Sequence, residues 1–136
     1  MQAEAEGRMQ DACDLFAEAW AASKDDYNAC VAAHYLARHQ ANPEEMLRWN
    51  QQALVRANAV GDESVRSFYP SLYLNMGYSY ETLGHRAEAR RYYELAAESV
   101  EHLPPGRYGD QVRNGIAEGR KRVSSKNSTV PSPLKS

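Results

Sequence analysis

The stretch YLNMGYSYETLGHRAEARRYYELA, residues 73–96, decides the fold. Apolar and small residues recur in it every three or four positions on both sides of Gly84, which is the spacing of two helices joined by a tight turn. Gly77 and the alanines would let the two helices approach closely, while Tyr80 and Tyr93 would fill the space between them. We therefore expect a helical hairpin in this part of the chain.

The second half of this hairpin recurs earlier in the chain. The spacing G-x4-A-x3-aromatic-x2-A is met by Gly84, Ala89, Tyr93 and Ala96, and also by Gly7, Ala12, Phe16 and Ala19. A weaker copy lies between them at Ala41, Met46, Asn50 and Ala53. Since self-similarity at such periods is typical of stacked helical repeats, we expect repeats rather than an irregular bundle.

Residues 73–96 resemble the tetratricopeptide repeat. That repeat has an aromatic residue, then Leu-Gly, then Tyr on its first helix, which Tyr73, Met76, Gly77 and Tyr80 match except that methionine replaces leucine. The usual closing proline is displaced to Pro104, and the copies are separated by 34 and 43 residues. The longer period resembles the long-helix repeats of kinesin light chains and peptide-sensing bacterial regulators. The resemblance covers about residues 7–103. It implies an all-α fold in which antiparallel helix pairs stack as a short right-handed solenoid.

Turn and cap residues divide the chain. We expect one helical domain over 1–123, made of a half repeat at 1–24, repeats at 26–60 and 63–103, and a capping helix at 107–123. Asn42-Pro43 offers an N-cap followed by a first-turn proline, and Gly61-Asp62 ends one helix and caps the next. Pro70 predicts either a kink or a helix start. Residues 124–136 are polar and Ser/Pro-rich, so we expect a disordered tail.

Composition excludes several classes of protein. Strand signals are nearly absent, and no apolar run reaches the roughly 18 residues that span a bilayer. The two cysteines, Cys13 and Cys30, are too few for a disulfide framework, so we expect a cytoplasmic protein. A net charge of −2 does not favour nucleic-acid binding. We expect another protein or a peptide as the partner, with no nucleic acid and no membrane.

Motifs for chemistry are missing. There is no phosphate-binding loop, HExxH zinc motif, nucleophile elbow or EF-hand loop, so we expect no catalytic residue, no metal and no cofactor. An enzyme would have to be built from His34, Tyr78 and Glu81, which are the only plausible acid-base candidates. The leading hypothesis is a protein-protein interaction module. The alternatives are a regulatory sensor of a short peptide or small ligand and, less favoured, a small enzyme.

In the tetratricopeptide family, the first helix of each repeat faces a concave groove that holds the partner. In the third repeat the resemblance places Ser71, Leu74, Asn75, Tyr78, Glu81 and Thr82 on that face. In the middle repeat the register is open by one residue. One register gives Tyr27, Cys30, His34 and Arg38, and the other gives Asp26, Ala29, Ala33 and Ala37. The first is favoured because it keeps the alanines inside.

The resemblance also assigns the packing residues. In the first and third repeats these are Ala12, Phe16, Ala19, Tyr73, Met76, Gly77, Tyr80, Gly84, Ala89, Tyr93 and Ala96. Gly7 would occupy a turn, which leaves too little chain before it for a first helix. The apolar stripe of the helix after Gly7 would then lack a cover on one side. We therefore expect that a second copy covers it, giving a homo-oligomer, or that the natural chain starts upstream of Met1.

Overall fold

The chain is helical throughout the part described by a computed structural model, residues 2–124. This range contains six α-helices, two short 3-10 helices and no strand, which confirms the all-α class. It falls into two compact units, Met1–Gly61 (unit 1) and Asp62–Ser136 (unit 2). The predicted disordered tail lies outside the described residues, apart from Ser124. Within residues 2–124, no helix combines the length and the apolar character needed to cross a membrane.

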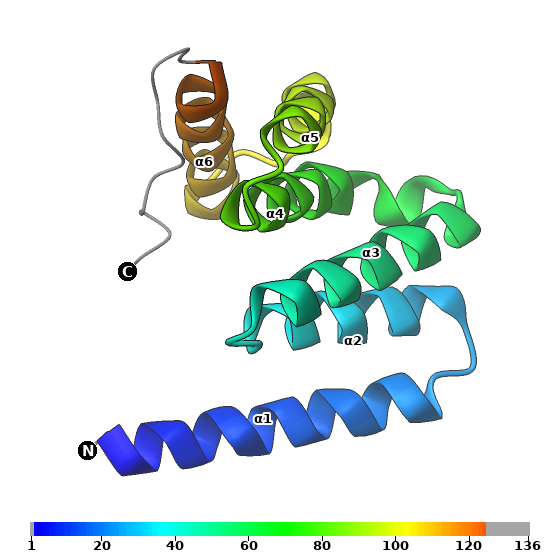
Figure 1. Cartoon of the computed structure of the whole chain (residues 1–136). Helices are drawn as coiled ribbons and strands as arrows, with labels where there is room; N and C mark the ends of the chain where they lie inside the picture. The colour runs from blue at the N-terminus through cyan, green and yellow to red at the C-terminus, as the bar shows by residue number, and fades with distance from the viewer. Residues whose placement is uncertain (1, 125–136) are drawn as a thin grey trace. The chain divides into compact units, whose positions relative to one another are not determined.

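Unit 1 consists of α1 (Gln2–Ala22), α2 (Asp26–Arg38) and α3 (Pro43–Val60). Figure 1 shows α2 and α3 as an antiparallel pair joined by a short turn, and α2 also packs against α1. The helix starts follow from local chemistry, because the Asp25 carboxylate accepts from the Asn28 N–H and the Asn42 side chain accepts from two first-turn N–H groups. At the end of α3, Gly61 adopts a left-handed φ of 66°.

Helix α1 corrects one expectation from the sequence. Gly7 was expected in a turn, with too little chain before it for a helix, but α1 runs without a break from Gln2 to Ala22. A single glycine costs a helix only about 1 kcal/mol relative to alanine. Ala3, Glu4, Ala5 and Glu6 on one side, and Arg8 and Met9 on the other, are good helix formers. Their combined propensity is enough to continue the helix through the glycine.

Unit 2 contains the 3-10 helices η1 (Glu63–Phe68) and η2 (Val100–His102) and three α-helices. The α-helices are α4 (Tyr69–Thr82), α5 (Arg86–Ser99) and α6 (Arg107–Ser124). Pro70 lies in the first turn of α4, so the prediction that a helix starts at this proline is confirmed. Helix α4 packs against α5, and α6 packs against both (Figure 1). Three helices therefore share the core of this unit.

The core of unit 2 has two apolar clusters. One is formed by Ala96, Leu103, Val112 and Ile116, and the other by Ala89, Tyr93 and Val123. Leu74 of α4 packs against both clusters and so links them. The apolar residues of α6 thus recur at a helical period, and they hold α6 onto the α4–α5 pair.

Candidate functional site

Helix α2 carries three of the residues predicted to bind a partner. Tyr27, His34 and Arg38 follow one another at intervals of seven and four residues, so they form one stripe along the helix. Tyr27 has 38% of its surface exposed and Arg38 is also exposed, while His34 is half-buried. Tyr35 flanks this stripe and is likewise exposed. We call these four residues the α2 face.

Contacts between rings and charges order the α2 face. The Arg38 guanidinium lies 5.6 Å from the centre of the Tyr35 ring, and the His34 ring meets Tyr35 edge-on at 5.6 Å. Tyr35 also stacks against Phe16 of α1, with ring centres 4.8 Å apart. Since the rings of His34 and Tyr35 are held by neighbours, these two side chains would lose little conformational entropy on binding.

The side of α2 opposite the α2 face is buried, which limits the residues that a partner could reach. Ala29, Ala33 and Ala37, which make up most of the second register, are buried, as the first register requires. Cys30 departs from that register, because it was expected on the groove face and is buried. Burial raises the pKa of its thiol to about 11, which makes it an inert packing group rather than a nucleophile.

The pKa of His34 is lowered, as expected for a histidine that is removed from water. Desolvation, followed by the nearby Arg38 charge, lowers its pKa to about 4. The imidazole is therefore neutral at pH 7. It presents an uncharged hydrogen-bonding ring beside the Arg38 cation.

The six groove residues predicted on α4 differ in how exposed they are. Tyr78 has 37% of its surface exposed, and Asn75 and Thr82 are half-buried. Ser71 is buried and Leu74 is half-buried, with a methyl group of Leu74 against Gly115 of α6. Only Tyr78, Asn75 and Thr82 are therefore available to a partner, because α6 already lies against part of this helix.

Glu81 requires a correction. We expected it on the accessible groove face, yet only 3% of its surface is exposed. Its Oε1 accepts from the Tyr93 hydroxyl at 2.6 Å, and Arg122 of α6 donates to both carboxylate oxygens, from Nε at 2.8 Å and from Nη2 at 3.0 Å. A buried carboxylate needs such partners, so Glu81 belongs to the packing of α6.

Tyr93 occupies the centre of unit 2. A Cβ at Gly77 would lie 2.8 Å from its ring and a Cβ at Gly119 would lie 2.5 Å from it. Both glycines therefore make room for one fully buried aromatic ring. Burial is the main reason why the pKa of Tyr93 is raised, and the Glu81 carboxylate adds to the shift. Two of the glycines of α6, Gly115 and Gly119, are contact points with Leu74 and Tyr93.

The remaining packing residues of unit 2 divide by burial. Met76, Gly77, Ala89 and Ala96 are buried, Tyr73 and Tyr80 are half-buried, and Gly84 lies in the exposed turn with a φ of 83°. Tyr92, which the repeat pattern did not single out, connects the two tyrosines. Its ring lies 5.6 Å from Tyr80 and 6.3 Å from Tyr73.

In α1 the predicted packing stripe is only partly covered. Ala12 and Phe16 are half-buried, but Ala19 is exposed, which corrects its assignment as a packing residue. Trp20 takes the inward place instead, with its indole edge-on to Trp49 of α3 at 5.3 Å. The larger ring reaches α3 from its own position and leaves Ala19 on the outer side.

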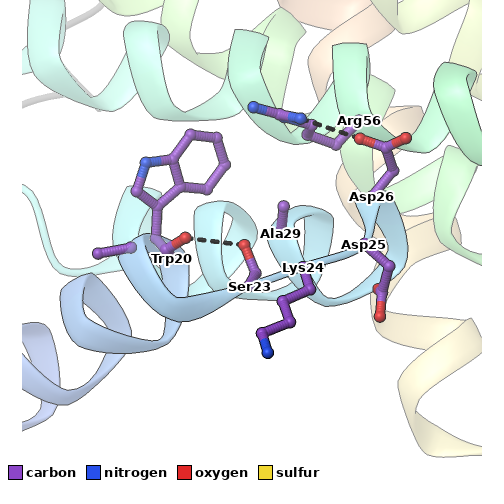
Figure 2. A pocket seen from close by; sticks show the side chains of 8 residues that line it. Trp20, Ser23, Lys24, Asp25, Asp26, Ala29 and Arg56 are labelled. Carbon is purple, nitrogen blue, oxygen red and sulfur yellow. Dashed lines mark hydrogen bonds and ion pairs between the residues drawn. The ribbon is translucent and has the colours of Figure 1, made fainter.

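A pocket in unit 1 was not predicted from the sequence. It has a volume of about 340 Å³ and is lined by Trp20, Ala21, Ser23, Lys24, Asp25, Asp26, Ala29 and Arg56. Figure 2 shows the indole of Trp20 and the guanidinium of Arg56 on one side, with Lys24 extending away on the other. Arg56 lies 5.1 Å from the centre of the Trp20 ring and pairs with Asp26 at 2.9 Å.

A smaller hollow lies on another side of Trp20. It has a volume of about 230 Å³ and is lined by Trp20, Arg48, Trp49 and Gln52. Two tryptophans and two arginines are therefore grouped in unit 1, since Arg48 lies 5.7 Å from the Trp49 ring. Trp49 and Arg56 are seven residues apart and therefore share a face of α3, which is a signal the sequence does carry. Nothing in the sequence indicated that this face meets Trp20.

The described residues contain no group of three or more His, Cys, Asp or Glu side chains that could hold a metal ion. The sequence matches no family model, and the comparisons with curated proteins and with solved structures gave no match either.

Proposed function

We propose that this chain is a protein-interaction module of the tetratricopeptide-repeat type, which binds an extended peptide or a helix of another protein. The observation that carries the proposal is the α2 face. Tyr and Arg are the residue types that most often dominate binding energy at protein interfaces, and here Tyr27, Tyr35 and Arg38 remain exposed on a folded helix pair.

The contacts that fix side chains on the α2 face favour a binding role, because a face that only meets solvent would not need them. A surface helix commonly exposes long, flexible charged residues, whereas this one exposes two tyrosines, one of which contacts both Phe16 and Arg38. Tyrosines offer a large contact area and a hydroxyl group at a low entropic cost. On α4, Tyr78 with Asn75 and Thr82 would provide further contacts of the same kind.

The proposal favours binding over catalysis. Glu81 is one of the three acid-base candidates. Both of its carboxylate oxygens are held by Tyr93 and Arg122, so this group takes part in packing. His34 would act only as a weak base, since its pKa is about 4. We retain the cytoplasm as the proposed location.

Affinity capture with matched variants tests the proposal. The full chain would serve as bait in an extract of its native cell, and captured proteins would then be purified and titrated. We expect Tyr27→Ala/Arg38→Ala to weaken binding about tenfold or more, which corresponds to about 1.4 kcal/mol. The matched control, Arg107→Ala/Tyr108→Ala, removes an exposed tyrosine and an exposed arginine from α6. Equal affinities for all three proteins would reject the proposal.

A regulatory sensor is the second candidate function. The pocket beside Trp20 favours it, because a volume of about 340 Å³ lies in the range of small-molecule sites. In that case the occupied pocket would change how unit 1 binds its partner.

Self-association through α1 also remains a proposal. Leu15 has 64% of its surface exposed on α1, and Ala19 is exposed on the next turn. Against this, Phe16 and Trp20 are engaged by Tyr35 and Trp49 of the same chain, so less apolar surface is left to cover than the sequence suggested. Light scattering of the native chain and of Leu15→Asp across a range of concentrations would test it. A native mass that stays monomeric at every concentration would reject it.

A further inference from the structure

The last turn of α6 carries a serine that follows three basic residues. The segment Arg120-Lys121-Arg122-Val123-Ser124 places positive charges two, three and four positions before Ser124. Ser124 is exposed, and its hydroxyl donates to the Lys121 carbonyl at 3.1 Å, so it lies at the surface. Lys121 is accessible too, with 76% of its side chain exposed. A hydroxyl preceded by bases has the charge pattern of a substrate for protein kinases that bind basic residues.

Two arginines of α5 lie beside the same turn. Arg86 donates from Nε to the Val123 carbonyl at 2.8 Å, and Arg90 donates to it from Nη2 at 2.9 Å. This carbonyl belongs to the peptide bond between Val123 and Ser124, so both guanidinium groups are close to the serine. Arg90 is exposed and pairs with no carboxylate within residues 2–124. Its charge is therefore available to a new anion at this end of α6.

We infer that Ser124 is a phosphorylation site for a protein kinase that recognises basic residues, and that Arg86 and Arg90 bind the resulting phosphate. In this reaction the Ser124 oxygen forms a bond to the γ-phosphorus of ATP, and the bond from that phosphorus to the ADP oxygen breaks. The hydroxyl proton passes to a base of the kinase. The phosphoserine then carries about two negative charges at pH 7 and three strong acceptor oxygens.

The two arginines determine how the phosphate acts on α6. A negative group at the C-terminus of a helix is unfavourable, since the last carbonyls already carry partial negative charge. Here Arg86 and Arg90 supply positive charge at that end, and guanidinium groups form short, charge-assisted hydrogen bonds with phosphate oxygens. The phosphate would therefore tie the end of α6 to the start of α5 and would not unwind the helix.

The fold limits access to Ser124. Val123 is 3% exposed and packs in one cluster with Tyr93, and Arg122 is held by Glu81. A kinase that binds the residues before Ser124 therefore needs the last turn of α6 to open. Helix ends open at a lower free energy than helix interiors, so this turn can open while the rest of α6 stays folded. We expect the folded chain to be phosphorylated more slowly than an unfolded peptide of the same sequence.

The first test needs no binding partner and does not depend on the α2 face. The purified full chain is incubated with Mg-ATP and the catalytic subunit of cAMP-dependent protein kinase, which prefers basic residues before its serine. Peptide mass spectrometry should locate one phosphoryl group on Ser124 in the native chain and in Ser125→Ala, but none in Ser124→Ala. Lys121→Gln should lower kcat/KM about tenfold, because one charged contact with the kinase is lost. Lys24→Gln, at an exposed lysine of unit 1, is the matched control and should leave it unchanged.

The second test measures the phosphate itself. An unperturbed phosphoserine has a second pKa of about 6, and neighbouring guanidinium groups should lower it because they stabilise the dianion. Phosphorus nuclear magnetic resonance against pH gives this pKa in the folded phosphoprotein. Arg86→Gln and Arg90→Gln should each raise it towards the value of the urea-unfolded chain. Arg91→Gln should not, because the Arg91 side chain lies over the Tyr92 ring. Circular dichroism checks that every variant is folded.

Three results would overturn the inference. The first is a native chain that takes up no phosphate on Ser124, including one that takes it up only at Ser125 or beyond. The second is a phosphate pKa that is the same in the folded and the urea-unfolded chain, or that Arg91→Gln changes as much as Arg90→Gln does. The third is a melting temperature that falls on phosphorylation, which would show that the phosphate unwinds the end of α6.

Discussion

Unit 1 and unit 2 bury their helices in different ways. In unit 2, α6 lies against α4 and α5 and brings Arg122 to a buried carboxylate, while Arg86 and Arg90 donate to the Val123 carbonyl at its end. In unit 1, α1 meets its neighbours mainly through ring contacts, and a pocket and several aromatic side chains stay accessible. The last helix of unit 2 is therefore fixed by polar as well as apolar contacts, whereas unit 1 leaves accessible the side chains on which the proposed binding role rests.

The largest expected effect lies in unit 2, at the glycines around Tyr93. Gly119→Leu should destabilise the protein by about 3 kcal/mol, because its side chain must enter space that the Tyr93 ring fills. Gly77→Leu should behave alike. Ala117→Leu, at an exposed position of the same helix, should cost less than about 0.5 kcal/mol. Urea denaturation followed by circular dichroism measures all three, and a stable Gly119→Leu protein would disprove the packing of α6.

The next effect concerns the buried carboxylate. Arg122→Met should cost about 2 kcal/mol, since it leaves Glu81 with only the Tyr93 hydroxyl in a buried site. Adding Glu81→Gln should recover part of this loss, because the uncompensated charge is removed. The four proteins form a double-mutant cycle. An interaction energy near zero would show that the two groups are not coupled.

A smaller effect is expected in unit 1 and depends on pH. The pKa of His34 is lowered to about 4 in the folded protein, against about 6.5 unfolded, so the unfolded chain binds more protons between these values. His34 should therefore contribute stability above pH 6.5 that is lost as the pH falls towards 4. Between pH 7 and pH 5 we expect a loss of about 1 kcal/mol from this group, discounted because the ring is only half-buried.

Denaturation curves of the native protein and of His34→Gln, each at pH 7 and pH 5, measure this contribution. The substituted protein should lose less stability over the interval. If both proteins lose the same amount, His34 is not the group that titrates.

Local signals in the sequence were sufficient for much of the fold. The bounds of α3 and the start of α4 follow from Asn42, Pro43, Gly61 and Pro70, which act on their own neighbours. Pairings between distant helices were not accessible in this way. Glu81 was expected on the groove face because the resemblance to the repeat places it there, and its partner Arg122 lies 41 residues further along the chain.

The candidate site also combines features that local sequence predicts with features that depend on contacts between distant helices. The stripe of Tyr27, His34 and Arg38 could be predicted because helical spacing places these residues on one face, and this register was favoured since it keeps the alanines inside. The pocket could not, since it depends on how Trp20 and Arg56 meet from two separate helices. Gly115 and Gly119 of α6 are a further example. Their packing role depends on the side chains that lie opposite them, Leu74 and Tyr93, which come from other helices.

Substituting the exposed side chains of the α2 face should change stability least and partner binding most. This substitution tests the central claim that unit 1 carries the partner surface. The measurement is the Kd of the captured partner for three purified proteins, namely the native chain, Tyr27→Ala/Arg38→Ala and the α6 control Arg107→Ala/Tyr108→Ala. We predict unchanged helical circular dichroism in all three and a Kd that rises about tenfold or more only in the α2 variant. A Kd that rises in the α6 control but not in the α2 variant would contradict the account.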